Sequence, residues 1–185
     1  MQEIVKTAIV VGVSEPKVGT AVLNVTGTDN KEGANILSTD SNHKPGATDA
    51  GKAAAILSTV SGEEMLRSII HPKEVKELKA QATADTTPLE FAKGGAGDYL
   101  GKDATPKATA LAGGIALRSL VKTGKLASGA ADNIAGGKSD VQTVGIDAAN
   151  KLLGAVEKIV KKTVKNILEK AKEKIDEARN LKTAK

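Results

Sequence analysis

The stretch that most constrains the fold is the end of the chain, where residues 139–181 contain no proline. Apolar residues recur there at steps of three and four, in the series Leu153, Val156, Val160, Val164, Ile167, Ala171, Ile175 and Ala178. Their mean spacing is about 3.6 residues, the period of a straight α-helix, whereas a strict 3.5 repeat would wind a supercoil. We therefore expect one helix of roughly 60 Å over residues 139–181.

The start and the role of this helix can also be inferred from its residues. Ser139 and Gln142 have the spacing of a capping box, which predicts Ser139 as the N-cap. Such a helix is most simply a scaffold, and we expect the other segments to pack on its apolar stripe. Three alternatives are a coiled-coil partner, a membrane-surface helix and a nucleic-acid-binding arm. The stripe is too narrow, and too interrupted by Lys161, Lys162 and Lys165, to cross a membrane.

The net charge of the chain is concentrated on the same helix. The formal net charge is +5, and residues 157–185 alone carry ten basic and five acidic residues. A basic face attracts phosphate or acidic lipid, but mixed pairs such as Glu157 with Lys161 are typical of a solvated surface. Binding of single-stranded nucleic acid also requires aromatic stacking platforms, which residues 157–185 do not contain. We therefore expect no nucleic-acid partner.

Composition restricts both the core and the chemistry. The chain has no cysteine, which excludes a disulfide framework and a thiolate metal site. Phe91 and Tyr99 are its only aromatic residues, so the core must consist of Val, Ile, Leu and Ala on closely packed helices. A length of 185 residues fits one domain. We divide it into a loop-rich helical region, 1–138, and a long scaffold helix with a tail, 139–185.

Local signals predict a mainly α fold. Ser61 with Glu64, and Thr87 with Pro88 and Glu90, have the spacing of helix starts. Strand-like composition occurs once, at residues 20–25. We expect a helical bundle with glycine-rich loops and at most a small β-hairpin.

A buried helix is expected at residues 106–122, because the run from Ala108 to Leu117 is predominantly apolar or glycine. Pro106 after Thr105 predicts its start, and Gly124 predicts its end. Gly113 and Gly114 would let a neighbouring helix approach closely.

No motif supports catalysis or a cofactor. Residues 132–139 approach a phosphate-binding loop, but Asp132 occupies the first glycine position and no strand precedes it. Residues 95–97 lack the third glycine of a dinucleotide fingerprint, since Leu100 stands there. His43 and His71 lie in unrelated loops, without other ligands at a metal-site spacing. We expect no enzyme, no cofactor and no metal.

Several motifs carry a family resemblance. The segment from Gly113 to Ala127 resembles the invariable motif of the variable large proteins of relapsing-fever Borrelia, and residues 150–178 resemble their C-terminal helix. Segments 50–57, 60–66 and 88–92 match in the same order. The resemblance implies the C-terminal part of a helical surface antigen.

The family implies an outer-surface lipoprotein of the outer membrane, anchored by an acylated N-terminal cysteine. Its serotype switching evades host antibody, so host antibodies are the expected partners. The leader and the lipidated cysteine are expected to lie outside this sequence. The alternative function is a binding module for a host plasma protein such as a complement regulator.

These inferences name two sets of residues and a set of loops. The invariable buried motif comprises Ile115, Ala116, Leu117, Arg118, Leu120, Val121, Lys122, Gly124 and Lys125. The scaffold stripe comprises Leu153, Val156, Val160, Val164, Ile167 and Ile175. Replaceable display loops are expected at 27–48, 80–87 and 94–105, because substitutions in exposed loops cost little stability.

Overall fold

The computed structural model describes residues 1–19, 30–39, 44–71, 82–95, 100, 106–121, 126 and 137–183. Within these ranges the protein is helical, and the one β-type pairing is an isolated bridge between Ser38 and Gly95. The predicted mainly α class is confirmed, whereas the strand expected at residues 20–25 lies outside the described residues. The helices are α1 (Gln2–Val10), α2 (Asn30–Gly33), η1 (Ala34–Leu37), α3 (Ala47–Thr59), α4 (Gly62–Ile70), α5 (Pro88–Lys93), α7 (Ala108–Leu120) and α8 (Gly137–Thr183).

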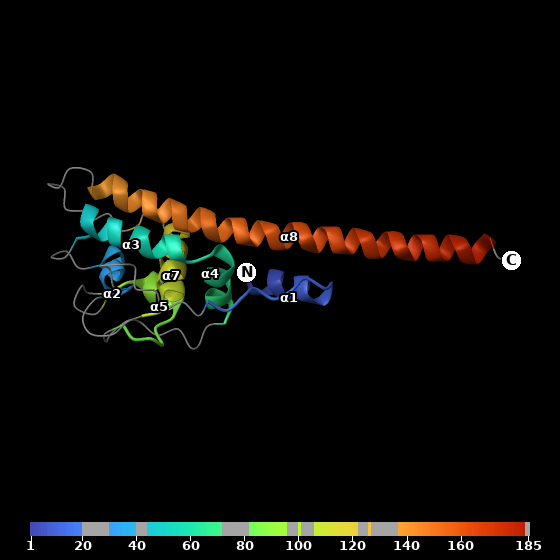
Figure 1. Ribbon diagram of the computed structural model, residues 1–185, viewed down its shortest axis with the longest axis horizontal. Helices are drawn as coiled ribbons and strands as arrows, with labels where there is room; N and C mark the ends of the chain where they lie inside the picture. Colours follow the sequence, from blue (N-terminus) through green and yellow to red (C-terminus); the bar gives the residue numbers. More distant parts are fainter. Residues whose placement is uncertain are drawn as a thin grey trace.

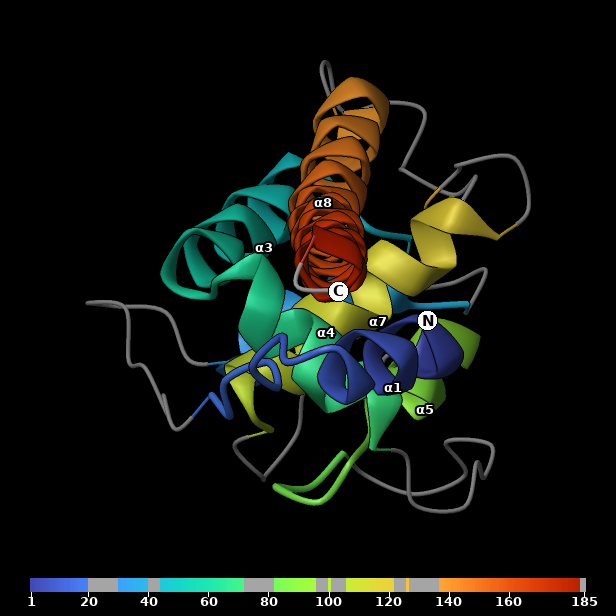
Figure 2. The same cartoon turned by 90° about the vertical axis from the view of Figure 1, so that its right-hand side faces the viewer.

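Helix α7 lies at the centre of the body and contacts α2, α3, α4, α5, η1 and α8 (Figure 2). The Leu111 and Ile115 side chains are completely buried. A Cβ atom added at Gly113 would lie 3.1 Å from Pro88 Cβ, and one at Gly114 would collide with Phe91. The predicted close approach of a neighbouring helix is thereby confirmed, and that neighbour is α5.

The ends of α7 differ from the sequence prediction. The helix begins at Ala108 with Lys107 as its N-cap, because Lys107 keeps an extended backbone (φ −67°, ψ 132°). Pro106 therefore precedes the helix and is not its first residue. The helix ends at Leu120, and the predicted cap Gly124 lies outside the described residues.

Two helix starts follow from their predicted caps. The amide of Glu64 donates to the Ser61 hydroxyl at 3.2 Å, and the Ser61 amide donates to the Glu64 carboxylate at 2.8 Å. Thr87 and Glu90 exchange the same two bonds, at 3.3 and 2.7 Å. Both capping boxes are confirmed.

Helix α8 has 47 residues, which corresponds to about 70 Å. Its first half covers α3, α4 and α7, and its second half extends beyond the body, with α1 beside the start of the extension (Figure 1). The Asn166 side chain donates to the carbonyl of Val11 at 3.1 Å and joins the two helices. The helix begins at Gly137, so Ser139 is a helical residue and the predicted capping box at Ser139 is wrong.

The stripe predicted as the packing surface of α8 is also wrong. Leu153, Val160, Val164, Ile167 and Ile175 are 42–52% exposed, and Val156 is partly buried against the core. The buried side chains instead follow a neighbouring register, with the same steps of three and four: Val141, Val144, Ala148, Leu152, Ala155 and Ile159. Two of these are alanines, which allow close helix packing but add little to an apolar pattern.

Candidate functional site

The candidate site is a set of contacts between residues that stand next to the segments connecting the helices. The first of these contacts is the bridge between Ser38 and Gly95. The amide of Thr39 donates to the Gly95 carbonyl at 3.0 Å, and Ser38 is 2% exposed. These residues adjoin two segments, 40–43 and 96–99. Both segments therefore start from one fixed point of the body.

Arg118 of α7 reinforces the same point. Its guanidinium Nη1 donates to the carbonyl of Leu37 at 3.3 Å. It also lies against Gly94, where a Cβ atom would collide with it and where the backbone has φ +75°, a conformation that favours glycine. Burial lowers the pKa of the Arg118 guanidinium below its usual range. Arg118, a residue of the predicted motif, thus contacts the chain at both Leu37 and Gly94, shortly before segments 40–43 and 96–99.

A second buried contact joins the first residue of α2 to Pro106, which stands just before the N-cap of α7. The Nδ2 atom of Asn30, which is 1% exposed, donates to the carbonyl of Pro106 at 2.9 Å. Asn30 follows segment 20–29, and Pro106 follows segment 101–105. The bond thereby holds Asn30 beside Pro106, which is 76 residues away in the sequence.

These contacts share one chemical property. The acceptors are the backbone carbonyls of Leu37, Gly95 and Pro106, which any residue at those positions would provide. The donors from side chains, Arg118 and Asn30, belong to helices of the body. The contacts therefore do not depend on the side chains of the connecting segments.

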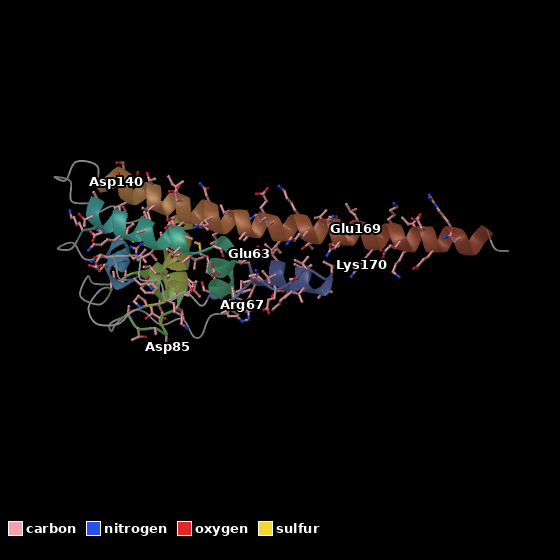
Figure 3. The ribbon with its side chains drawn as sticks, viewed as in Figure 1. Glu63, Arg67, Asp85, Asp140, Glu169 and Lys170 are labelled. Carbon is pink, nitrogen blue, oxygen red and sulfur yellow. The ribbon has the colours of Figure 1, made fainter. Side chains whose placement is uncertain are left out.

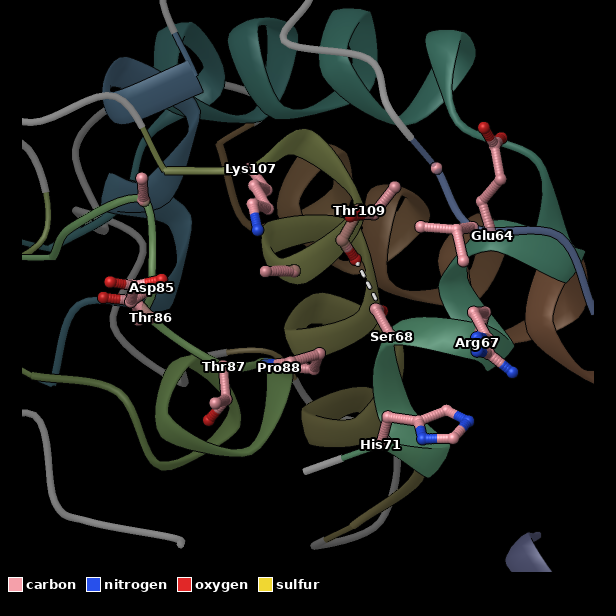
Figure 4. A pocket seen from close by; sticks show the side chains of 14 residues that line it. Glu64, Arg67, Ser68, His71, Asp85, Thr86, Thr87, Pro88, Lys107 and Thr109 are labelled. Atoms are coloured by element: carbon pink, nitrogen blue, oxygen red, sulfur yellow. Dashed lines mark hydrogen bonds between the residues drawn. The ribbon is translucent and has the colours of Figure 1, made fainter. Parts of the chain in front are cut away.

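A cleft of about 260 Å³ lies between α4, α5 and α7 (Figure 4). The Lys107 amine points into it, with Asp85 and Thr87 on one side and Thr109 on the other. The Ser68 hydroxyl donates to the carbonyls of Met65 and Thr109, at 2.7 and 3.2 Å. A nucleophilic serine requires a base that accepts its proton, but this proton is directed at backbone carbonyls.

One edge of the cleft carries a charged cluster. Arg67 forms an ion pair with Glu15, and His71 Nε2 lies 3.2 Å from the same carboxylate. Both side chains point away from Lys107 in Figure 4. The cluster ties the segment after α1 to α4. Among the described residues, no group of three or more His, Asp or Glu side chains could hold a metal ion.

The predicted invariable motif is only partly buried. Ile115 and Ala116 are completely buried, and Leu117 and Arg118 are half-buried, so the expectation that Leu117 is inaccessible is wrong. Leu120 and Val121 are 41% and 61% exposed, because they lie at the end of α7 on its outer side. Lys122, Gly124 and Lys125 lie outside the described residues.

The expected display loops contain core residues, so the expectation that they are exposed throughout is wrong. Residues 30–37, inside the predicted loop 27–48, form α2 and η1, and Ile36 and Leu37 are completely buried. Ala82 and Leu100, in the other two predicted loops, are 4% and 1% exposed. The glycine pair 94–95 was a signal for the Arg118 contact, whereas no local signal marked Asn30.

Comparison with known proteins gives the family. A family model described as Borrelia lipoprotein matches residues 1–175. Variable large protein 7 of Borrelia hermsii is 61% identical over 181 residues, which are 97% of this chain and 49% of that protein. Variable large protein 21 of the same organism is 58% identical, over 100% of this chain and 50% of its own length. The chain thus spans about half the length of the curated relatives it matches.

A solved structure has a similar fold. It is the crystal structure of the Lyme disease variable surface antigen VlsE of Borrelia burgdorferi, with a TM-score of 0.66 and 24% sequence identity. The similarity covers 93% of this chain and 63% of VlsE. Since the family model covers nearly the whole sequence, the chain belongs to the Borrelia lipoprotein family, and the resemblance to variable large proteins is confirmed.

Proposed function

We propose that this chain is the loop-bearing scaffold of a variable surface antigen, which evades host antibody by changing its loops and performs no catalysis. The similarity to proteins named variable large proteins supports this proposal, as does the fold shared with a variable surface antigen. The family description as a lipoprotein supports a position on the outer membrane, held by a lipid anchor. Among the described residues, no helix is both long and apolar enough to cross a membrane.

The observation that carries the proposal is that the residues next to the connecting segments are held by hydrogen bonds to backbone carbonyls. Arg118, Asn30 and the Thr39 amide all donate to backbone carbonyls. Residues in the connecting segments can therefore change without removing a partner from these bonds. Exposed substitutions away from caps and core usually alter the free energy of unfolding by less than about 0.5 kcal/mol. Such a scaffold tolerates variation where antibodies bind.

The test pairs stability with antibody recognition. Residues 40–44 are replaced together, as are residues 98–103 with the buried Leu100 retained. We expect a melting temperature within about 2 °C of the wild type and loss of binding by serotype-specific antibodies. The matched control is Ile36→Ala, in the same sequence region but completely buried, which should lower the melting temperature clearly.

A second measurement addresses the invariable buried motif. Antibodies raised against a peptide of residues 115–125 should bind unfolded protein better than native protein, because Ile115, Ala116 and Ser119 are buried. Equal binding to the two forms, or unfolding caused by the loop replacements, would contradict the proposed division between scaffold and display.

The cleft favours a second candidate function, binding of a host plasma protein. Lys107 forms no ion pair with any described residue, and the cleft presents Asp85 nearby, so both charges are available to a partner. Purified plasma proteins would be tested for binding at physiological salt to the wild type and to Lys107→Gln. Binding that is lost with modest added salt, and unaffected by Lys107→Gln, would indicate nonspecific charge attraction.

A further inference from the structure

The chain forms a closed turn at residues 83–86, shortly before α5. The amide of Thr86 donates to the Thr83 carbonyl at 3.0 Å, and the amide of Thr83 donates to the Thr86 hydroxyl at 2.8 Å. The Asp85 amide donates to the Thr83 hydroxyl at 3.2 Å. Threonine hydroxyls stabilise turns in this way, because they can bond to backbone amides a few residues away. Three hydrogen bonds thus hold a turn of four residues.

Buried residues anchor both ends of this turn. Ala82 is 4% exposed, Thr86 is 8% exposed, and the buried Pro88 begins α5. Helix α5 packs closely on α7 at this point, since a Cβ atom added at Gly113 would lie 3.1 Å from Pro88 Cβ. The capping box of Thr87 with Glu90 holds the first turn of α5. The position of the turn on the body is therefore fixed as well as its shape.

Between these anchors the turn presents three exposed residues, Thr83, Ala84 and Asp85. Figure 3 shows Asp85 at the edge of the body opposite α8. Asp85 forms no ion pair within the part of the chain that the structure describes, so its carboxylate can accept hydrogen bonds from another molecule. The turn also borders the cleft that contains Lys107 (Figure 4). Its exposed side chains thus occupy defined positions on the surface.

We propose that, within the proposed function of antigen display, this turn is a conformational antibody epitope and Thr86 is the positioning residue that sets its shape. The proposal depends on that function and adds to it a route for antigenic change. Thr86 is too buried for an antibody to contact, yet its hydroxyl holds the Thr83 amide. A substitution at residue 86 can therefore alter antibody recognition while every exposed side chain stays the same.

The partner is an antibody whose binding surface directs hydrogen-bond donors or a positive charge at Asp85. Binding to a turn that is already ordered loses less conformational entropy than binding to a flexible segment. Without the Thr86 hydroxyl, the Thr83 amide can bond to water, because Thr83 is exposed, and the turn can open. An antibody must then reorder the turn when it binds, which weakens its affinity.

The test uses monoclonal antibodies raised against the native full chain. Antibodies to the turn are identified by loss of binding to Asp85→Lys. We expect them to bind Thr86→Val at least about fivefold more weakly than the wild type, which corresponds to the loss of one hydrogen bond. Thr86→Ser keeps the hydroxyl and should bind within about twofold of the wild type. The same antibodies should bind native protein better than unfolded protein, in contrast to antibodies against residues 115–125.

Ser119→Ala is the matched control for loss of a buried hydroxyl. Ser119 is 4% exposed, and its hydroxyl donates to the Ile115 carbonyl at 2.8 Å, within α7. Ser119→Ala should leave the binding of Asp85-dependent antibodies unchanged, because the hydrogen bond that it removes lies outside the turn. Hydrogen exchange of the Thr83 amide gives a second readout, since its protection should fall in Thr86→Val and persist in Thr86→Ser.

Three outcomes would overturn the proposal. Equal binding to the wild type and Thr86→Val, or equal losses in Thr86→Val and Thr86→Ser, would show that the hydroxyl does not set the shape of the epitope. Antibodies that recognise residues 40–44 or 98–103, but never depend on Asp85, would show that the turn is not an epitope and would leave the display function intact. Antibodies that depend on none of these segments would overturn the display function as well.

Discussion

The capping box of α4 shows how a single carboxylate links a helix start to pH. Glu64 accepts hydrogen bonds from the Ser61 hydroxyl at 2.7 Å and from the Ser61 amide at 2.8 Å, and these bonds lower its pKa. Because the folded-state pKa lies below the unfolded one, protonation favours the unfolded state. The stabilisation is therefore present above the ordinary pKa of about 4.3 and is lost as pH falls through the folded-state pKa.

We predict that Glu64→Gln is less stable than the wild type at about pH 6, and that the difference disappears near about pH 3. The free energy of unfolding at each pH, from urea titrations, checks this. Glu63→Gln is the control, since Glu63 lies in the same turn but outside the capping box. A difference that stays constant across this pH range would contradict the prediction.

Two glycines on the α4–α8 side of the molecule give opposite expectations for the same substitution. A Cβ atom at Gly62 would collide with the Lys151 carbonyl of α8 and lie 3.1 Å from Ala155 Cβ. Gly154, inside α8, has open space around it. Gly62→Ala should therefore destabilise the protein by roughly 1–3 kcal/mol. Gly154→Ala should stabilise it by roughly 0.5–1 kcal/mol, because alanine is the better helix residue.

Chemical denaturation of both variants measures this contrast. Gly62 begins α4 and Gly154 lies inside α8, so intrinsic helix propensity favours alanine at both positions and only the packing separates them. If both substitutions changed the free energy of unfolding in the same direction, the packing of α4 on α8 would be incorrect.

At the scale of elements, the register of α8 decides which side chains stabilise the fold. Leu152 is completely buried, whereas the adjacent Leu153 is 45% exposed. Lys151 supports this register, because its amine donates to the Leu57 carbonyl of α3 at 2.7 Å.

We predict that Leu152→Ala costs about 2–5 kcal/mol and that Leu153→Ala costs less than about 1 kcal/mol. Thermal and urea unfolding of the two variants provide the measurement, and each serves as the control of the other. If Leu153→Ala destabilised the protein more than Leu152→Ala, the stripe through Leu153 would be the packing surface after all.

At the scale of the whole molecule, α8 belongs partly to the body and partly to the extension. Ile159 is 7% exposed and Asn166 bonds to Val11, whereas residues 171–180 are all exposed. The last turns of the helix therefore contribute little to the free energy of global unfolding.

We predict that removal of residues 171–185 changes the melting temperature by less than about 2 °C while reducing the helical signal in circular dichroism. Removal of residues 159–185 should lower the melting temperature substantially, because it deletes the contacts of Ile159 and Asn166 with the rest of the protein. Similar losses in both truncations would show that residues 171–185 pack on the body.

The sequence by itself determined the features that depend on near neighbours along the chain. The capping boxes at Ser61 and Thr87, the length of α8 and the buried centre of α7 all follow from spacing and composition within one or a few turns. The family also followed from short motifs. The local signals failed at Ser139 and Pro106, because a cap acts only where the preceding chain turns away from the helix.

Only the tertiary structure decided which surfaces meet. Helix α8 offers two nearly equivalent registers, through Leu152 and through Leu153, and the alanines at 148 and 155 favour the first because they let other helices approach. The same holds for Leu100, which is buried although its local sequence is polar and rich in glycine. The contacts of Asn30 and Arg118 join residues 76 and 81 positions apart. Local periodicity contains no information about such distant partners, because they become neighbours only when the helices pack.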